Sequence, residues 1–125
     1  MGSYYGGINA GSNPAPTAMN TTITHSQRAT AQTIIDLTAI HFGITPGQIV
    51  GKRQDADISD ARHVAMYLLD KEKVCGKYKI AILVNRNHTV VTYAIGKVKS
   101  LLSIKDPSIT AAVNDIENIL TIINS

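Results

Sequence analysis

Apolar residues recur every three or four positions through most of the chain after residue 22. This spacing is typical of α-helices that bury one face, whereas half-buried strands alternate at every second position. The pattern is clearest from His88 to about Ile104, where the apolar stripe consists of Val91, Ala94, Ile95, Val98, Leu101 and Leu102. No strand pair or hairpin signal is present. The sequence therefore predicts an all-α fold, a five- to six-helix bundle that contains a helix-turn-helix.

Turn and capping residues divide this pattern into helices. We expect helices over about 26–42, 59–71, 77–84, 88–104 and from 107 onward, with a further short helical piece at about 48–50. Gly43 should end the first helix, with Pro46 and Gly47 in the turn that follows. Asp57 or Ser59 should cap the helix at 59–71, while Asn87 and Asp106 cap the last two. The segment 77–84 also has strand-like composition, so helix and strand both remain open there.

Composition separates the first 22 residues from the rest. This segment combines glycine and proline with Ser, Asn, Thr and Ala, which break helices and bury little apolar surface. We expect a flexible tail over 1–22 and one helical domain over 23–125. A chain of 125 residues has the length of a single domain.

Several classes of protein are disfavoured. No apolar run approaches the roughly 20 residues that span a bilayer, and no export signal is readable, so we expect a cytoplasmic protein without a membrane partner. The four histidines and single cysteine lack ligand spacing, which predicts neither metal nor cofactor. Gly51 and Lys52 do not end a phosphate-binding P-loop, because Pro46 stands where that loop needs glycine. With no catalytic motif, we expect no enzyme.

Positive charge is concentrated in the second half of the chain. The net charge is only +3, but eleven of the twelve Lys and Arg residues lie between Lys52 and Lys105. From Lys71 to Lys105 there are eight basic residues and a single acid, Glu72. Such a segment attracts polyanions, of which nucleic acid is the first candidate, although a solvated lysine-rich face would look the same.

The two helices expected at 77–84 and 88–104 are joined by a polar turn of two or three residues. The second of them begins with Arg86, Asn87, His88 and Thr89, all of which carry hydrogen-bond donors. In helix-turn-helix proteins the start of the second helix enters the major groove and contacts base edges. This segment therefore indicates a DNA-binding helix-turn-helix, and ordinary surface residues of a bundle are the alternative.

Three segments, in order and at nearly constant spacing, carry a resemblance to a known family. They are ITPGQIVGKR at 44–53, DARHVAMYL at 60–68, and IA at 80–81 followed by NRNHTVV at 85–91, with Ala94, Lys97 and Val98 beyond. The stretch from Ile34 to about Val98 resembles the C-terminal DNA-binding domain (domain IV) of the bacterial replication initiator DnaA. The resemblance implies a Trp-repressor-like helical domain that binds double-stranded DNA.

The resemblance and the charge pattern together give candidate contact residues. The expected base contacts are Arg86, Asn87, His88, Thr89 and Val90. The expected contacts to the DNA backbone are Lys52, Arg53, Arg62, Lys77, Lys97 and Lys99. Gln54 occupies the position of the family's minor-groove arginine.

Some of these positions depart from the family pattern. Asn87 stands for an aspartate, Val90 for a threonine and Gln54 for an arginine, while Asp55 and Asp57 add negative charge that phosphates would repel. Two functions therefore stay open. One is sequence-preferring binding of double-stranded DNA in a bacterial nucleoid, regulating replication initiation or transcription at DnaA-box-like sites. The other is a protein-interaction module that kept the fold but lost specific DNA binding, with a replication initiator or another replication protein as partner.

Overall fold

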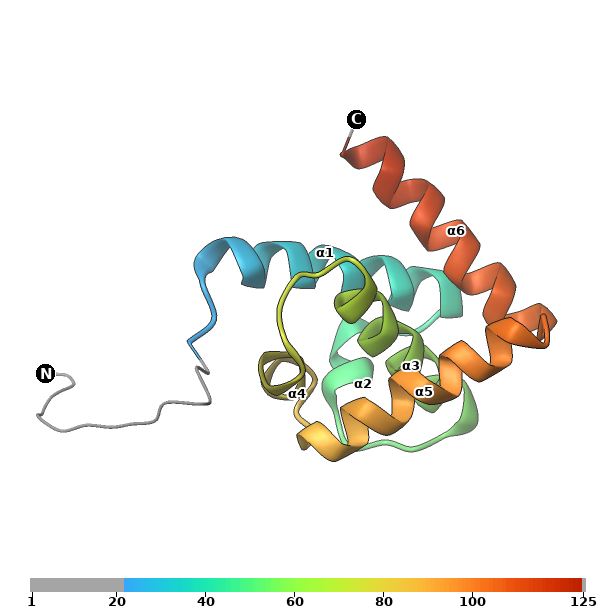
Figure 1. Ribbon diagram of the computed structural model, residues 1–125, viewed down its shortest axis with the longest axis horizontal. Coiled ribbons are helices and arrows are strands. Elements are labelled where there is room, and N and C mark those ends of the chain that lie inside the picture. The colour runs from blue at the N-terminus through green and yellow to red at the C-terminus, as the bar shows by residue number, and fades with distance from the viewer. Residues whose placement is uncertain (1–21, 125) are drawn as a thin grey trace, which may run out of the picture.

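The computed structural model describes residues 22–124, which form six α-helices joined by short loops (Figure 1). The helices are α1 (His25–Phe42), α2 (Pro46–Val50), α3 (Ala56–Lys71), α4 (Lys77–Val84), α5 (His88–Ser103) and α6 (Pro107–Ile123). No strand occurs in this part of the chain, so the all-α expectation is confirmed and the segment 77–84 is a helix. The tail expected over 1–22 lies outside the described residues, apart from Thr22.

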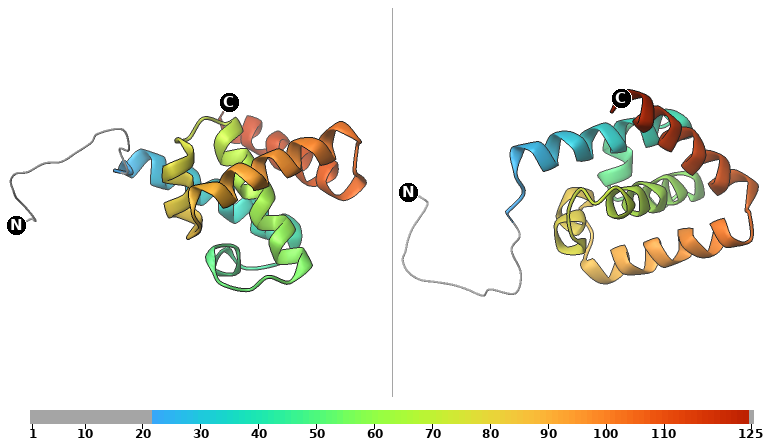
Figure 2. Two further views of the ribbon diagram at one scale, coloured as in Figure 1. Left: turned by 60° about the horizontal axis from the view of Figure 1, so that its bottom comes forward. Right: turned by 45° about the horizontal axis from the view of Figure 1, so that its top comes forward.

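Helix α3 is the centre of the bundle. It contacts each of the other five helices. Figure 2 shows α3 in its right-hand view enclosed by α1, α4, α5 and α6. Because neighbours cover α3 on several sides, nine of its sixteen residues are buried, far more than the single stripe of a surface helix.

The core consists of the apolar stripes that the periodicity marks. One large cluster joins α1, α3, α4, α5 and α6, and includes Ile34, Leu68, Ile80, Val98 and Ile116. A smaller cluster fixes α2 in place by packing Ile49 against α1 and α3. None of the described helices is long and apolar enough to cross a bilayer.

Capping side chains explain where the first two helices begin. Thr24 and Gln27 form a reciprocal capping box, so α1 starts at His25, one residue before the expected start. Thr45 and Gln48 form a second box. The placement of Pro46 and Gly47 in a turn is therefore wrong, because both lie in the first turn of α2, with Pro46 at a position that needs no backbone donor.

The start of α3 also differs from expectation. The helix begins at Ala56, three residues before the expected start, with Asp55 rather than Asp57 or Ser59 at the N-cap position. The Asp55 side chain makes no capping hydrogen bond, and its carboxylate accepts instead from Arg53 Nη2 at 2.6 Å. Asp57 falls in the first helical turn, where negative charge is favourable. The expectation that Asp57 or Ser59 caps α3 is therefore wrong, because Asp55 holds the N-cap position and its carboxylate is in an ion pair.

The turn between α4 and α5 depends on one residue in a left-handed conformation. Asn85 ends α4 with φ 58° and ψ 48°, and Arg86 N donates to Ala81 O at 2.9 Å. Asparagine tolerates this region better than most non-glycine residues. A three-residue turn can therefore close without glycine, and α5 begins at His88 as expected.

Candidate nucleic-acid interface

Helices α4 and α5, with the turn between them, form the expected helix-turn-helix. In Figure 1, α4, the start of α5 and the loop that follows α2 lie along the same lower side of the molecule. Asn87 is the N-cap of α5, as expected, and its Oδ1 accepts from Val90 N at 2.9 Å. This bond fixes the backbone of the first turn of α5, while the Asn87 side-chain NH2 group keeps its donors.

Arg86 connects the turn to the loop after α2. Its Nη2 donates to Gly51 O at 2.6 Å and its Nη1 donates to Asn85 O at 2.8 Å. Gly51 is 35 residues away in the sequence, so this contact joins two segments of the lower side that no local pattern relates. The guanidinium thereby helps fix the loop position, and much of its donor capacity is used within the protein.

Arg62 makes more hydrogen bonds to the segment 48–53 than Arg86 does. Its side chain rises from α3 and is 4% exposed. Nε donates to Ile49 O at 2.5 Å, and Nη2 donates to the carbonyl oxygens of Gln48, Gly51 and Arg53 at 2.9–3.2 Å. Burial, and next the nearby Arg86, lower the pKa of Arg62, yet an arginine stays protonated in proteins.

The structure places Arg62 differently from the other residues expected to contact the DNA backbone. Its guanidinium faces inward and donates to four carbonyl groups, and its contact with DNA stays a prediction. Arg62 thereby holds both the C-terminal end of α2 and the loop after it against α3. Arg62 and Arg86 share the Gly51 carbonyl oxygen, so the two arginines together attach this loop to α3 and to the helix-turn-helix.

The other residues expected to contact bases differ in how exposed their side chains are. His88 and Thr89 are exposed in the first turn of α5, and Asn87 is exposed beside them. Val90 is partly buried and packs against the main core, which leaves less of its side chain for a thymine methyl group. The surface that the first turn presents is therefore formed mainly by Asn87, His88 and Thr89.

The expected backbone contacts other than Arg62 lie near the surface of the described structure. Lys52, Arg53, Lys77, Lys97 and Lys99 are exposed, and so is Gln54 at the expected minor-groove position. Arg53 differs from the lysines because it is paired with Asp55. Phosphate would have to compete with that carboxylate for the Arg53 guanidinium.

Two aromatic contacts at this interface had no sequence signal. The Tyr78 ring lies over the His88 imidazole, with centroids 4.6 Å apart and planes inclined by 39°. On the other flank of α5, the Tyr93 ring meets His63 of α3 edge-on at 6.2 Å. Burial and then Lys97 lower the pKa of His63. Helix packing creates both pairs, and spacing along the chain does not indicate them.

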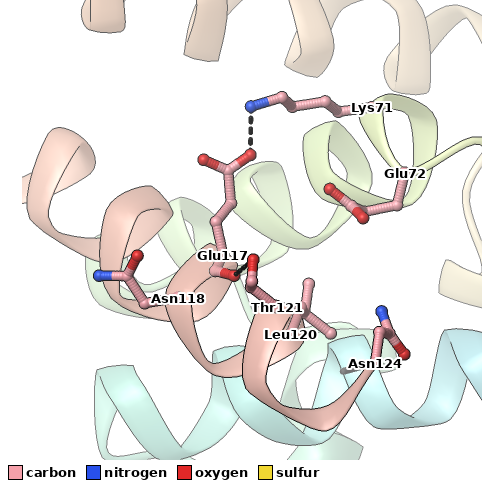
Figure 3. Close-up of a pocket in the computed structure, with 7 residues that line it drawn as sticks. All are labelled: Lys71, Glu72, Glu117, Asn118, Leu120, Thr121 and Asn124. Atoms are coloured by element: carbon pink, nitrogen blue, oxygen red, sulfur yellow. Dashed lines mark hydrogen bonds and ion pairs between the residues drawn. The ribbon is translucent and has the colours of Figure 1, made fainter.

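Other parts of the described structure offer less chemistry. A polar pocket between the C-terminal parts of α3 and α6 is lined by charged and amide side chains and contains the Lys71–Glu117 ion pair (Figure 3). Burial raises the pKa of the Cys75 thiol, which makes it a weaker nucleophile. Among residues 22–124 no group of three or more His, Cys, Asp or Glu is arranged to hold a metal ion.

Comparison with known proteins decides the family. The family model described as bacterial dnaA protein helix-turn-helix matches residues 31–98, which is more than half of the chain and covers α2 to α4 with most of α1 and α5. The chain belongs to this DnaA helix-turn-helix family. The resemblance seen in the sequence and the all-helical DnaA fold that it implied are therefore confirmed, and membership supports DNA binding as the activity.

Two curated relatives agree with this assignment. The chain is 30% identical over 69 residues to the chromosomal replication initiator protein DnaA of Tropheryma whipplei strain Twist, and equally to that of strain TW08/27. Each alignment covers 55% of this chain but only 14% of the relative. The likeness is thus to one part of a DnaA protein. Helix α6 lies beyond the residues that the DnaA family model matches.

Proposed function

We propose that this protein binds double-stranded DNA with sequence preference through its DnaA-type helix-turn-helix. The start of α5 would enter the major groove, where Asn87, His88 and Thr89 would contact base edges. One observation carries the proposal: the first turn of α5 exposes His88 and Thr89 while its backbone is fixed by the Asn87 cap. Side chains that contact bases from an already ordered backbone lose little conformational entropy when the protein binds DNA.

Charge supports the same surface. The exposed side chains of Lys52, Lys77, Lys97 and Lys99 would neutralise phosphates on either side of the groove. Arg86 would act mainly by holding the loop after α2 beside the turn, because its Nη2 donates to Gly51 O. The cations would set affinity for any duplex, and the first turn of α5 would set the preference among duplexes.

The biological role follows from the class of DNA site. Bound at DnaA-box-like sites in a bacterial nucleoid, the domain would regulate replication initiation or transcription. It would do so by occupying sites or by competing with, or contacting, an initiator. These roles extend the proposed binding and depend on it.

The test is a fluorescence-anisotropy titration at two salt concentrations. The duplexes are one with a DnaA-box, its scrambled version, and a random pool from which a site is selected. We expect a preference that the His88→Ala/Thr89→Ala variant reduces by about 5- to 150-fold, since one good base contact contributes ~1–3 kcal/mol of discrimination. The matched control is Asn114→Ala/Asn118→Ala on the exposed face of α6.

Two results would contradict sequence preference. Equal and strongly salt-dependent binding of all three duplexes would leave only the phosphate contacts. An unchanged preference in a folded His88→Ala/Thr89→Ala variant would move base reading away from α5. Circular dichroism of each variant establishes that it is folded.

A protein-interaction module is the second candidate, and the loop before α3 favours it. Arg53 is paired with Asp55, and Asp57 adds another carboxylate in the first turn of α3. These groups weaken the attraction for phosphate on that flank. Absence of DNA binding at low salt by folded protein, together with salt- and nuclease-resistant retention of a replication protein, would support this second function.

A further inference from the structure

Tyr78 lies against the residue that the proposed function places at the centre of base reading. It belongs to the first turn of α4, whereas His88 is the first residue of α5. Their ring centroids are 4.6 Å apart and the planes are inclined by 39°, within the range of favourable aromatic contacts. The pair therefore connects the two helices of the helix-turn-helix at its outer surface.

Both side chains of this contact lie outside the core. Tyr78 is 42% exposed and His88 is exposed as well, and neither belongs to the buried clusters. Core residues Ile80, Val84 and Val91 already hold α4 against α5. The contact with Tyr78 thus restrains the imidazole itself rather than the position of the helix.

We propose that Tyr78 is a positioning residue for base reading: its ring holds the His88 imidazole in the orientation that meets a base edge. The inference rests on the proposed function. Without the ring, His88 would sample several rotamers and would have to be ordered on binding. Ordering one such side chain corresponds to about 2- to 12-fold in affinity.

The Tyr78–His88 contact should affect base-specific binding and leave binding to phosphates unchanged. Phosphate contacts depend on the lysines and are unaffected by the orientation of His88. Loss of the Tyr78 ring should therefore reduce discrimination at the base pair that His88 reads, while the salt dependence of binding stays unchanged. A merely structural role for Tyr78 would weaken binding to all duplexes alike.

A double-mutant cycle measures this coupling. Tyr78→Ala, His88→Ala and the double variant are titrated against the selected duplex and against versions substituted at single base pairs. We expect Tyr78→Ala to lower discrimination about 2- to 12-fold at the base pair where His88→Ala does so, and to have less than a 2-fold effect in the His88→Ala background. Tyr78→Phe keeps the ring and should stay within 2-fold of wild type.

Controls keep the test independent of folding. Ile122→Ala removes an exposed apolar side chain from α6, outside the proposed interface, and should leave discrimination at the His88 base pair unchanged. Tyr78→Leu keeps apolar bulk at position 78 without a tyrosine ring and replaces the alanine variant if that variant is unstable. It should lose discrimination as Tyr78→Ala does.

Each of the following outcomes overturns the inference. Additive effects of Tyr78→Ala and His88→Ala would show that the two side chains act separately. Loss of discrimination in Tyr78→Phe would assign the effect to the tyrosine hydroxyl. An equal loss of affinity for every duplex would make Tyr78 structural. If wild type discriminates and His88→Ala abolishes this while Tyr78→Ala does not, only the inference fails; absence of discrimination in wild type overturns the proposed function with it.

Discussion

Replacing Arg62 with methionine is the sharpest test of the arrangement beneath the interface. Methionine keeps most of the apolar stem and removes the guanidinium, so four hydrogen bonds are lost, two to the last turn of α2 and two to the loop after it. The Ile49 carbonyl receives its bond in a buried position, whereas the bonds to Gln48, Gly51 and Arg53 are partly buried. Water can therefore replace the last three more easily than the first.

The expected loss of stability follows from these bonds. A hydrogen bond from a charged donor contributes ~1.5–3 kcal/mol, which we assign in full to the Ile49 bond. The three partly buried carbonyls share the two hydrogens of Nη2, so together they contribute about 1–2 kcal/mol net. Burial of the methionine side chain and the avoided desolvation of a charge return part of this sum. We expect Arg62→Met to lower the free energy of unfolding by about 2–4 kcal/mol.

Urea-induced unfolding followed by far-UV circular dichroism measures this change, since the chain has no tryptophan. The loss corresponds to a fall in Tm of about 8–30 °C for a domain of this size. Arg53→Met is the matched control. Its guanidinium is exposed and paired only with Asp55, so stability should change by less than about 1 kcal/mol.

One combination of results would refute the reasoning. If Arg62→Met kept the free energy of unfolding within about 1 kcal/mol of wild type, the carbonyl contacts could not be holding the loop. If it also lowered the salt slope of DNA binding by about one, Arg62 would be contacting phosphate in solution, as the family resemblance implied.

Further predictions concern α5, α3 and α6. Lys97→Ala should weaken binding to every duplex and lower the salt slope by about one, and a change confined to one sequence would contradict a phosphate contact. The pKa of His63 is lowered in the folded state, so as the pH falls the unfolded chain binds a proton before the folded protein does. The free energy of unfolding should therefore decrease as the pH drops below ~6.5. Urea titrations at several pH values should show a smaller decrease for His63→Gln than for wild type. Ile116→Ala should cost ~2–5 kcal/mol since Ile116 is 1% exposed, whereas Ile122→Ala, at 73% exposed, should cost under ~0.5 kcal/mol; equal losses would mean that α6 does not pack as described.

Local signals in the sequence predicted most of the helices. The start of α5 follows from Asn87, whose side chain supplies the cap that its position suggested. The end of α1 follows from Gly43, which adopts φ 69°. Such features depend on neighbours within four residues, so they can be recognised without the tertiary fold. The start of α3 could not, because the residue at its N-cap position, Asp55, makes no capping hydrogen bond and is paired with Arg53 instead.

The sequence by itself determined an all-helical domain with a basic second half and a helix-turn-helix of the DnaA family. Only the tertiary structure decided which cations face outward. Arg62 and Arg86 look like DNA contacts in the sequence, yet their partners are backbone carbonyls of the end of α2, of the loop after it and of the turn itself. Every residue has a carbonyl, so no side-chain pattern marks those partners. The Tyr78–His88 contact is hidden for a related reason, since it depends on how α4 packs against α5.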